Sequence, residues 1–141
     1  MRIFYILVLI FPLFILSGCI EQSVVDEKMA RGCMAGVDAL TKGREIIEVK
    51  KTTPTSENFQ GEGLHRRVTI DVLEKDGWLE VDKQYSCVFL EEWGMFRSTH
   101  RALLMQIDIE GTIYGKNNGN IVGDWDDFLK LTRVVDAAMA Q

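Results

Sequence analysis

Two runs of alternating apolar and polar residues flank the dipeptide Asp76-Gly77 in the middle of the chain. A period of two is typical of a half-buried β-strand, and Asp-Gly favours the tight turn of a β-hairpin. The alternating positions are Leu64, Arg66, Val68, Ile70 and Val72 before the turn, and Leu79, Val81, Lys83, Tyr85, Cys87 and Phe89 after it. The pattern predicts an antiparallel hairpin with Cys87 on its apolar face.

A helix is predicted ahead of this hairpin, from Val24 to about Leu40. Its apolar and small residues follow the three-four spacing of a helical face, and Gly43 is a suitable stop. They are Val25, Met29, Gly32, Cys33, Gly36, Val37 and Leu40. Because Gly32 and Gly36 share a face with Cys33, we expect the helix to approach the sheet closely enough for Cys33 to reach a cysteine there.

The segments around these elements are less regular. Residues 44–51 fit either an extension of the helix or a first strand, and residues 52–58 are typical of an exposed loop. Residues 103–109 alternate again and predict a further strand, and residues 117–120 predict a turn after it. Since every connection is short, we expect the sheet to be antiparallel.

A second helix is predicted at the C-terminus. Asp124 is expected to cap it, with Asp126 and Asp127 in its first turn. Its apolar stripe is Phe128, Leu131, Val135 and Met139. The predicted fold is therefore α+β: an N-terminal helix, a three- or four-stranded antiparallel sheet, a C-terminal helix packed on one sheet face, and one disulfide.

Composition supports one folded domain in the chain of 141 residues, because 47% of them are hydrophobic and only two are prolines. The formal net charge of -5 disfavours attraction to nucleic acid. We therefore expect no nucleic-acid partner.

The N-terminus has the three-part layout of an export signal. A single cation, Arg2, precedes an apolar run from Ile3 to Leu16, which closes on the small residues Ser17 and Gly18. The run is short for a membrane-spanning helix, which needs about 20 apolar residues. The sequence favours a leader that is removed over a permanent anchor.

The junction Leu16-Ser17-Gly18-Cys19 resembles the lipobox of bacterial lipoprotein precursors. The resemblance covers the leader and this cysteine only. It implies removal of residues 1–18, a diacylglyceryl group on Cys19, and acylation of the new amine, for example by palmitate. Residues 19–23 are then a lipidated N-terminus with a short tether, and residues 24–141 form the domain. An ordinary signal peptide with a coincidental cysteine, or an uncleaved anchor, are the alternatives.

The residue after Cys19 bears on the final membrane. It is Ile20, whereas aspartate there is associated with inner-membrane retention in Gram-negative lipoproteins. For a Gram-negative host, the resemblance therefore favours the outer membrane, with the domain facing the periplasm. Surface exposure and the inner membrane remain open as alternatives.

With Cys19 assigned to lipid, Cys33 and Cys87 form an even pair in an oxidising compartment, so a single disulfide is predicted. Neither cysteine has a second Cys or His at a short ligand spacing, which disfavours zinc. We expect no metal and no cofactor beyond the covalent lipid on Cys19.

Both histidines adjoin arginines, in His65-Arg66-Arg67 and His100-Arg101. If their strands pair, these five residues form a basic patch able to hold a phosphate or carboxylate. The alternative is that they are solvated strand ends in an acidic protein.

The segment Trp93-Gly94-Met95-Phe96 lies between two predicted strands, where a connection is exposed. Large apolar side chains of this kind anchor interfaces, so Trp93, Met95 and Phe96 are candidate partner contacts. The alternative is that Trp93 and Phe96 fold over the end of the core.

The sequence predicts a non-enzymatic envelope lipoprotein that attaches to the membrane by its lipid and binds a protein or another envelope component. A small anionic-ligand-binding protein or a hydrolase that uses His65 and His100 is one alternative. A phage- or plasmid-encoded envelope protein that blocks a receptor is another.

Overall fold

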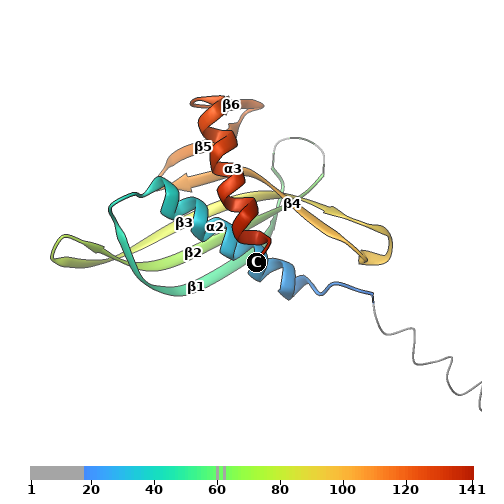
Figure 1. The fold of residues 1–141 in the computed structure, drawn as a ribbon, viewed down its shortest axis with the longest axis horizontal. Helices are drawn as coiled ribbons and strands as arrows, with labels where there is room; N and C mark the ends of the chain where they lie inside the picture. The colour runs from blue at the N-terminus through green and yellow to red at the C-terminus, as the bar shows by residue number, and fades with distance from the viewer. Residues whose placement is uncertain (1–17, 60, 62) are drawn as a thin grey trace, which may run out of the picture.

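A computed structural model describes residues 18–59, 61 and 63–141 (Figure 1). Residues 1–17 of the predicted leader, which include Leu16 and Ser17 of the lipobox, lie outside the described residues. The described elements are α2 (Gln22–Leu40), β1 (Glu45–Glu57), β2 (Leu64–Asp76), β3 (Leu79–Trp93), the short 3-10 helix η2 (Met95–Arg97), β4 (His100–Ile109), β5 (Thr112–Asn117), β6 (Asn120–Val122) and α3 (Trp125–Met139). The mixed α+β class predicted from the sequence is confirmed.

The strands form one antiparallel sheet in the order β1-β2-β3-β4-β5-β6. The described part of the chain thus contains six strands, and the prediction of three or four was wrong. The predicted hairpin is β2 and β3, in which Asp76 pairs with Leu79. Gly77, with a φ of 63°, occupies the first central position of the turn, where such a φ favours glycine.

Strand β1 accounts for part of the error. It includes residues 45–51 of the segment that fitted either a helix or a strand, and residues 52–57 of the segment predicted to be a loop. The threonines of this segment are good strand residues. Pro54, opposite Val68, is tolerated because β1 is an edge strand with one side free of ladder hydrogen bonds.

Strands β5 and β6 each follow a two-residue turn. Glu110 and Gly111 have φ values of 52° and 86°, and Asn118 and Gly119 have φ values of 49° and 82°. Two positive φ angles in succession are typical of the type I′ turn that joins tight hairpins. The Asn118-Gly119 turn was predicted, but β5 and β6 are short and have few apolar residues, so their alternation is weak.

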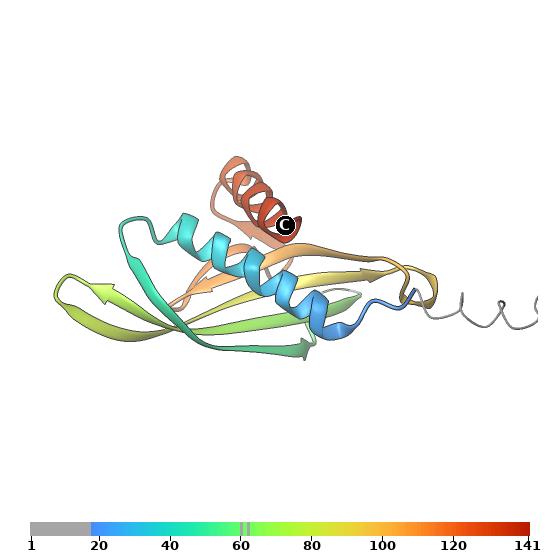
Figure 2. The ribbon, with the colours of Figure 1, turned by 60° about the horizontal axis from the view of Figure 1, so that its bottom comes forward.

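Both helices lie on one face of the sheet (Figure 2). Helix α2 packs on β2, β3 and β4, while α3 packs mainly across α2 and reaches the sheet at β4. A Cβ at Gly32 would lie 2.6 Å from Met139 Cγ, so the glycine is what allows the two helices to approach. As predicted, the Asp124 side chain caps α3 by accepting a hydrogen bond from the Asp126 amide at 2.7 Å.

The core lies between this face and the helices, and the Cys33–Cys87 disulfide is at its centre. The disulfide predicted from the sequence is confirmed, with both cysteines fully buried and their Cα atoms 5.7 Å apart. The largest buried side chains around it are Met29, Ile70, Tyr85, Phe89 and Ile107. None of the described helices has the length and apolar character that crossing a membrane requires.

Candidate functional site

The N-terminal end of the described chain is fixed to the loop that joins β3 to β4. The Ile20 amide donates to the Arg97 carbonyl oxygen at 3.1 Å. The Arg97 guanidinium donates to Gln22 Oε1 at 2.8 Å. Cys19 is exposed, and its Sγ lies 3.4 Å from the Phe96 carbonyl oxygen. The cysteine of the predicted lipobox thus lies against a specific loop of the domain.

We call residues 94–99 the β3–β4 loop. The Gly94 amide donates to the Thr99 carbonyl at 3.0 Å, and the Arg97 amide donates to the Gly94 carbonyl at 3.1 Å. Phe96 and Arg97 both have a φ of 56°, which costs a residue with a Cβ roughly 1–2 kcal/mol. Two strained residues in succession are held in place by these surrounding hydrogen bonds.

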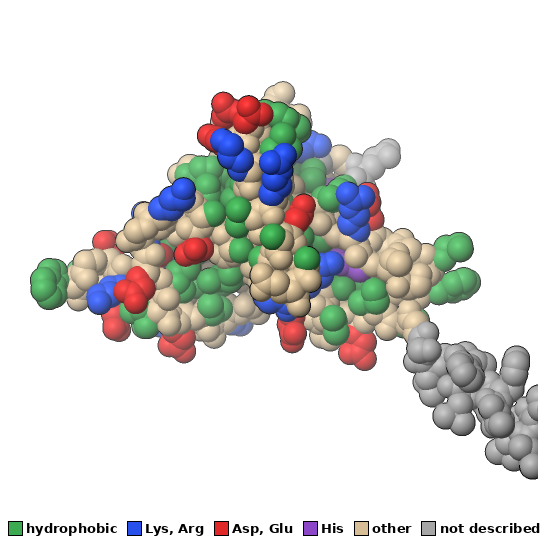
Figure 3. All heavy atoms as spheres, viewed as in Figure 1, with side chains coloured by type: hydrophobic (Ala, Val, Ile, Leu, Met, Phe, Trp, Pro, Cys, Tyr) green, Lys and Arg blue, Asp and Glu red, His purple; other side chains and the backbone are tan. Residues whose placement is uncertain are grey.

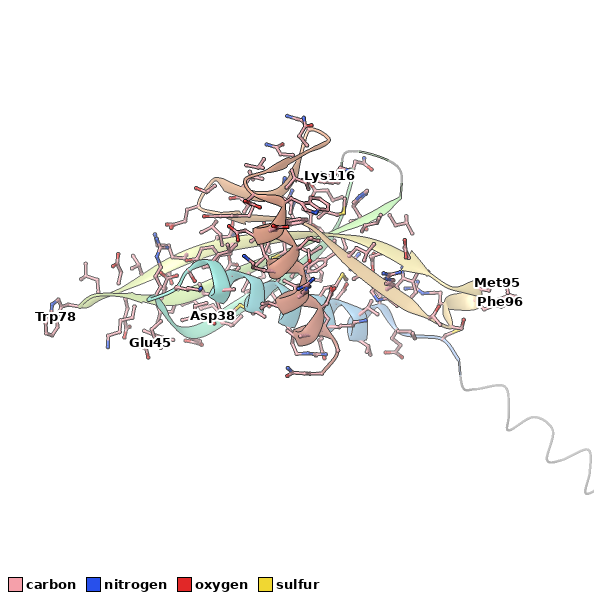
Figure 4. All side chains as sticks on the ribbon, turned by 45° about the horizontal axis from the view of Figure 1, so that its top comes forward. Asp38, Glu45, Trp78, Met95, Phe96 and Lys116 are labelled. Carbon is pink, nitrogen blue, oxygen red and sulfur yellow. A yellow bond between two sulfur atoms is a disulfide. The ribbon has the colours of Figure 1, made fainter. Side chains whose placement is uncertain are left out.

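This backbone shape turns Met95 and Phe96 outwards at one end of the molecule (Figure 4). Their side chains are 82% and 90% exposed. A space-filling view shows apolar side chains protruding at this end and at the opposite end of the sheet (Figure 3). Two adjacent large apolar side chains exposed at the tip of a loop make this end a candidate contact surface.

Trp93 behaves differently from its two neighbours in the predicted contact segment. It packs against the core, and its ring centroid lies 4.4 Å from that of His100. The Arg97 guanidinium stacks on the outer side, 3.9 Å from the Trp93 ring centroid. Trp93 therefore forms the base of the β3–β4 loop, while Met95 and Phe96 form its tip.

A buried pair of titratable groups lies beneath this base. His100 Nε2 is 3.0 Å from Glu91 Oε1, and the histidine side chain is only 1% exposed. Burial lowers the pKa of His100, and the nearby carboxylate of Glu91 opposes that shift. A neutral imidazole that donates from Nε2 to Glu91 is the form this arrangement favours.

The five residues of the predicted basic patch are not gathered on one surface. Arg66 makes two contacts with the Asp26 carboxylate of α2, at 3.0 and 2.7 Å. Arg67 is paired with Glu57 and donates to Ser86 Oγ at 2.8 Å. Arg101 is exposed.

The two histidines lie on opposite faces of the sheet. Glu91 of β3 pairs with Leu64 of β2, and paired residues point to the same face of a sheet. Arg66, two residues after Leu64, points to this helix-covered face as well. His100 contacts Glu91 and therefore lies on the same face. His65 points the other way and packs against Phe59, with ring centroids 5.4 Å apart. The sheet separates the two side chains, so they cannot line one anion-binding or catalytic pocket.

A hollow of about 610 Å³ lies between the start of α2, the end of β1 and the base of the β3–β4 loop. Its charged lining includes Arg66, Arg97, Glu57 and Glu91. Each of these groups has a partner among the described residues, in Asp26, Gln22, Arg67 and His100 respectively. Arg66 and Glu57 are therefore in ion pairs, whereas Arg97 and Glu91, one charge of each sign, are hydrogen-bonded to neutral groups. The hollow does not gather charges of one sign.

Two smaller hollows, of about 500 and 590 Å³, lie between α2 and β1. Ile47 and Val49 of β1 are exposed beside them. Lys50, Lys51 and Pro54 lie on the same edge strand and oppose pairing with another strand, since charges and proline blunt open edges.

At the other end of the sheet, Trp78 is fully exposed at the turn of the β2–β3 hairpin, followed by the largely exposed Leu79 (Figure 4). Trp78 was not among the contact residues predicted from the sequence. The available signal was its position, because a tryptophan directly after Asp76-Gly77 belongs to the turn of the predicted hairpin and is therefore exposed.

Comparisons with protein families, curated proteins and solved structures find no match for this chain. No cluster of three or more His, Cys, Asp or Glu side chains suited to a metal ion occurs among residues 18–59, 61 and 63–141.

Proposed function

We propose that the mature protein is a non-enzymatic envelope lipoprotein, anchored through lipid on Cys19, that binds a neighbouring protein or another envelope component. The observation that carries the proposal is the placement of two features at opposite ends of the domain. Cys19 lies against the backbone of Phe96, and Phe96 and the exposed Trp78 lie at opposite ends of the domain (Figure 4).

The position of Cys19 suits a lipid anchor. Its thiol is exposed, and α2 begins only three residues later, at Gln22. Acyl chains on Cys19 would hold the domain at the bilayer, because each buried methylene contributes about 0.8 kcal/mol and two or three chains bind far more firmly than one. With so short a tether, the domain stays next to the membrane in the proposed state.

The β2–β3 hairpin tip suits a contact with a partner. Trp78 offers a large apolar surface with a polar indole N–H, and Leu79 follows it. Tryptophan is enriched among the residues that dominate binding energy at interfaces. Attachment at the opposite end raises the effective concentration of this tip near a partner in the same envelope layer.

The hydrolase alternative requires His65 and His100 in one pocket. The two side chains lie on opposite faces of the sheet, and His100 is held by Glu91 beneath Trp93. We therefore favour binding over catalysis.

Replacement of Cys19 tests the anchor. Cys19→Ala is expected to abolish metabolic labelling by fatty acid and to release the protein from the membrane fraction. The matched control is the Cys33→Ala/Cys87→Ala pair, which leaves the lipobox intact and should still be labelled. Continued labelling of Cys19→Ala would reject the anchor.

A photoreactive amino acid at position 78 tests the contact. In cells that carry the full-length precursor, we expect a crosslinked adduct from position 78 that weakens when Cys19→Ala removes the tether. The same amino acid at Trp125, another exposed tryptophan, is the control. If position 78 gives no adduct, or position 125 gives the same one, the hairpin tip is not the contact.

A further inference from the structure

We infer that Met95 and Phe96 form a membrane-inserting tip, which enters the lipid interface beside the acylated Cys19. The inference rests on the proposed lipid attachment at Cys19. A lipid surface, rather than a protein, then covers the most exposed part of residues 93–96, the segment predicted to contact a partner.

The sulfur atom that carries the lipid in the proposed state lies beside the loop tip. Cys19 Sγ lies 3.4 Å from the Phe96 carbonyl oxygen. A diacylglyceryl group on this sulfur therefore begins beside the backbone of Phe96. Because its acyl chains run into the bilayer, the tip has to lie at the bilayer surface whenever the lipid is inserted.

Lipidation of Cys19 leaves intact the backbone and side-chain contacts that fix this arrangement. A thioether sulfur has no proton to donate to the Phe96 carbonyl, but the backbone hydrogen bond from Ile20 to Arg97 is unaffected. The Arg97 side chain holds Gln22 as well, at the start of α2. The loop and the lipid attachment point thus move as one unit.

The β3–β4 loop has a composition that suits contact with a lipid surface. Residues 94–99 read Gly-Met-Phe-Arg-Ser-Thr, with a single charge, that of Arg97, and no carboxylate. Met95 and Phe96 are its outermost side chains, 82% and 90% exposed. Apolar and aromatic side chains lower their free energy when they enter the interface.

The consequence is a defined orientation of the domain. A second contact beside the lipid prevents free rotation about a single tether. With the Met95–Phe96 end in the interface, the β2–β3 hairpin and Trp78, at the opposite end, are directed away from the membrane (Figure 4).

The test uses the mature lipoprotein in vesicles of phosphatidylethanolamine and phosphatidylglycerol, with an environment-sensitive fluorophore on a new cysteine. Phe96→Cys carries the probe at the tip, and Trp78→Cys carries it at the opposite end as the matched control. Cys33 and Cys87 are joined in the disulfide, and Cys19 is blocked by its thioether, so only the new thiol reacts. Mass spectrometry of the N-terminal peptide establishes whether Cys19 carries lipid.

We expect the probe at position 96 to emit several-fold more strongly and at shorter wavelength than the probe at 78, and to be quenched by nitroxide-labelled lipid. If Cys19 carries lipid but the probe at position 96 emits as it does in water, Met95 and Phe96 do not enter the lipid interface. The lipid anchor on Cys19 is then unaffected by the result. Absence of lipid on Cys19 overturns both proposals.

Two other results would also contradict insertion of Met95 and Phe96 into the lipid interface. Equal quenching at positions 96 and 78 would mean that the domain lies flat on the bilayer. A shift at 96 without quenching by the labelled lipid would mean that protein covers the tip. Met95→Cys repeats the measurement if Phe96→Cys fails to fold.

Discussion

Gly36 of α2 lies directly against Ile107 of β4: a Cβ at Gly36 would lie 2.5 Å from Ile107 Cδ1. The same Cβ would lie 3.0 Å from Val135 Cγ2 of α3. Real Cβ atoms do not approach their neighbours so closely, and interiors packed like crystals have little room to yield. The glycine is therefore what lets α2 contact the sheet and the second helix at once.

Gly36→Val is expected to lower the free energy of unfolding by about 1–3 kcal/mol, the usual cost of overpacking a core. Valine gains a few tenths of a kcal/mol of helix propensity over glycine, which is too little to compensate. Chemical denaturation with the disulfide intact measures the change. Ala35→Val is the control, since Ala35 adjoins the open hollow between α2 and β1, and it should cost only about 0.5 kcal/mol. Equal losses would contradict the packing argument.

Removing the disulfide is expected to have a larger effect. The cysteines are 54 residues apart, and closing a loop of that length removes about 4 kcal/mol of unfolded-state entropy in the chain-entropy model. Cys33→Ala/Cys87→Ala should therefore lower the free energy of unfolding by roughly this amount. Cys19→Ala, purified without lipid, should keep the stability of the oxidised domain. A double variant as stable as the oxidised protein would show that the bridge contributes little.

The parts of the fold that could be predicted are those with a strong periodic pattern. Three patterns predict that α2 packs on the β2–β3 hairpin: the apolar face of α2, the alternation in β2 and β3, and the small residues around Cys33. Cys33 and Cys87 meet at this contact. Strand β1 lacks such a pattern because it is an edge strand whose residues are mostly exposed. The sequence of β1 alone does not indicate that it pairs with β2.

The candidate site was predictable in part. Exposure of Met95 and Phe96 follows from their position between two strands, but the inward packing of Trp93 depends on the contact with His100 across β3 and β4. Neighbouring residues of a strand point to opposite faces, so Arg66 and Arg67 are unsuited to one patch on sequence grounds alone. The proximity of Cys19 to the β3–β4 loop has no local signal, because it joins residues 77 positions apart.

The Arg66–Asp26 pair is expected to fix α2 to β2. Both side chains are largely buried, at 16% and 15% exposed, and the guanidinium makes two contacts with the carboxylate. Arg66→Met should cost about 2 kcal/mol of unfolding free energy because it leaves a desolvated carboxylate without its partner. A double-mutant cycle with Asp26→Asn measures the coupling.

The exposed Lys130–Asp127 pair is the matched control for that cycle. Its two charges remain hydrated in the folded protein, so we expect no measurable coupling between them. If both cycles gave the same coupling energy, burial of Arg66 and Asp26 would not explain the strength of the first pair.

His100 is expected to make stability depend on pH between about 7.5 and 5.5. Burial lowers the pKa of His100 in the folded state below the value of about 6.5 for a free imidazole. The unfolded chain therefore binds the proton first, so the stabilisation is complete above about 6.5 and is lost as the pH falls through the folded pKa. Urea unfolding at pH 7.5 and 5.5 should show a larger loss of stability for the native protein than for His100→Gln. Equal losses would mean that the buried imidazole takes up its proton as readily in the folded domain as in the unfolded chain.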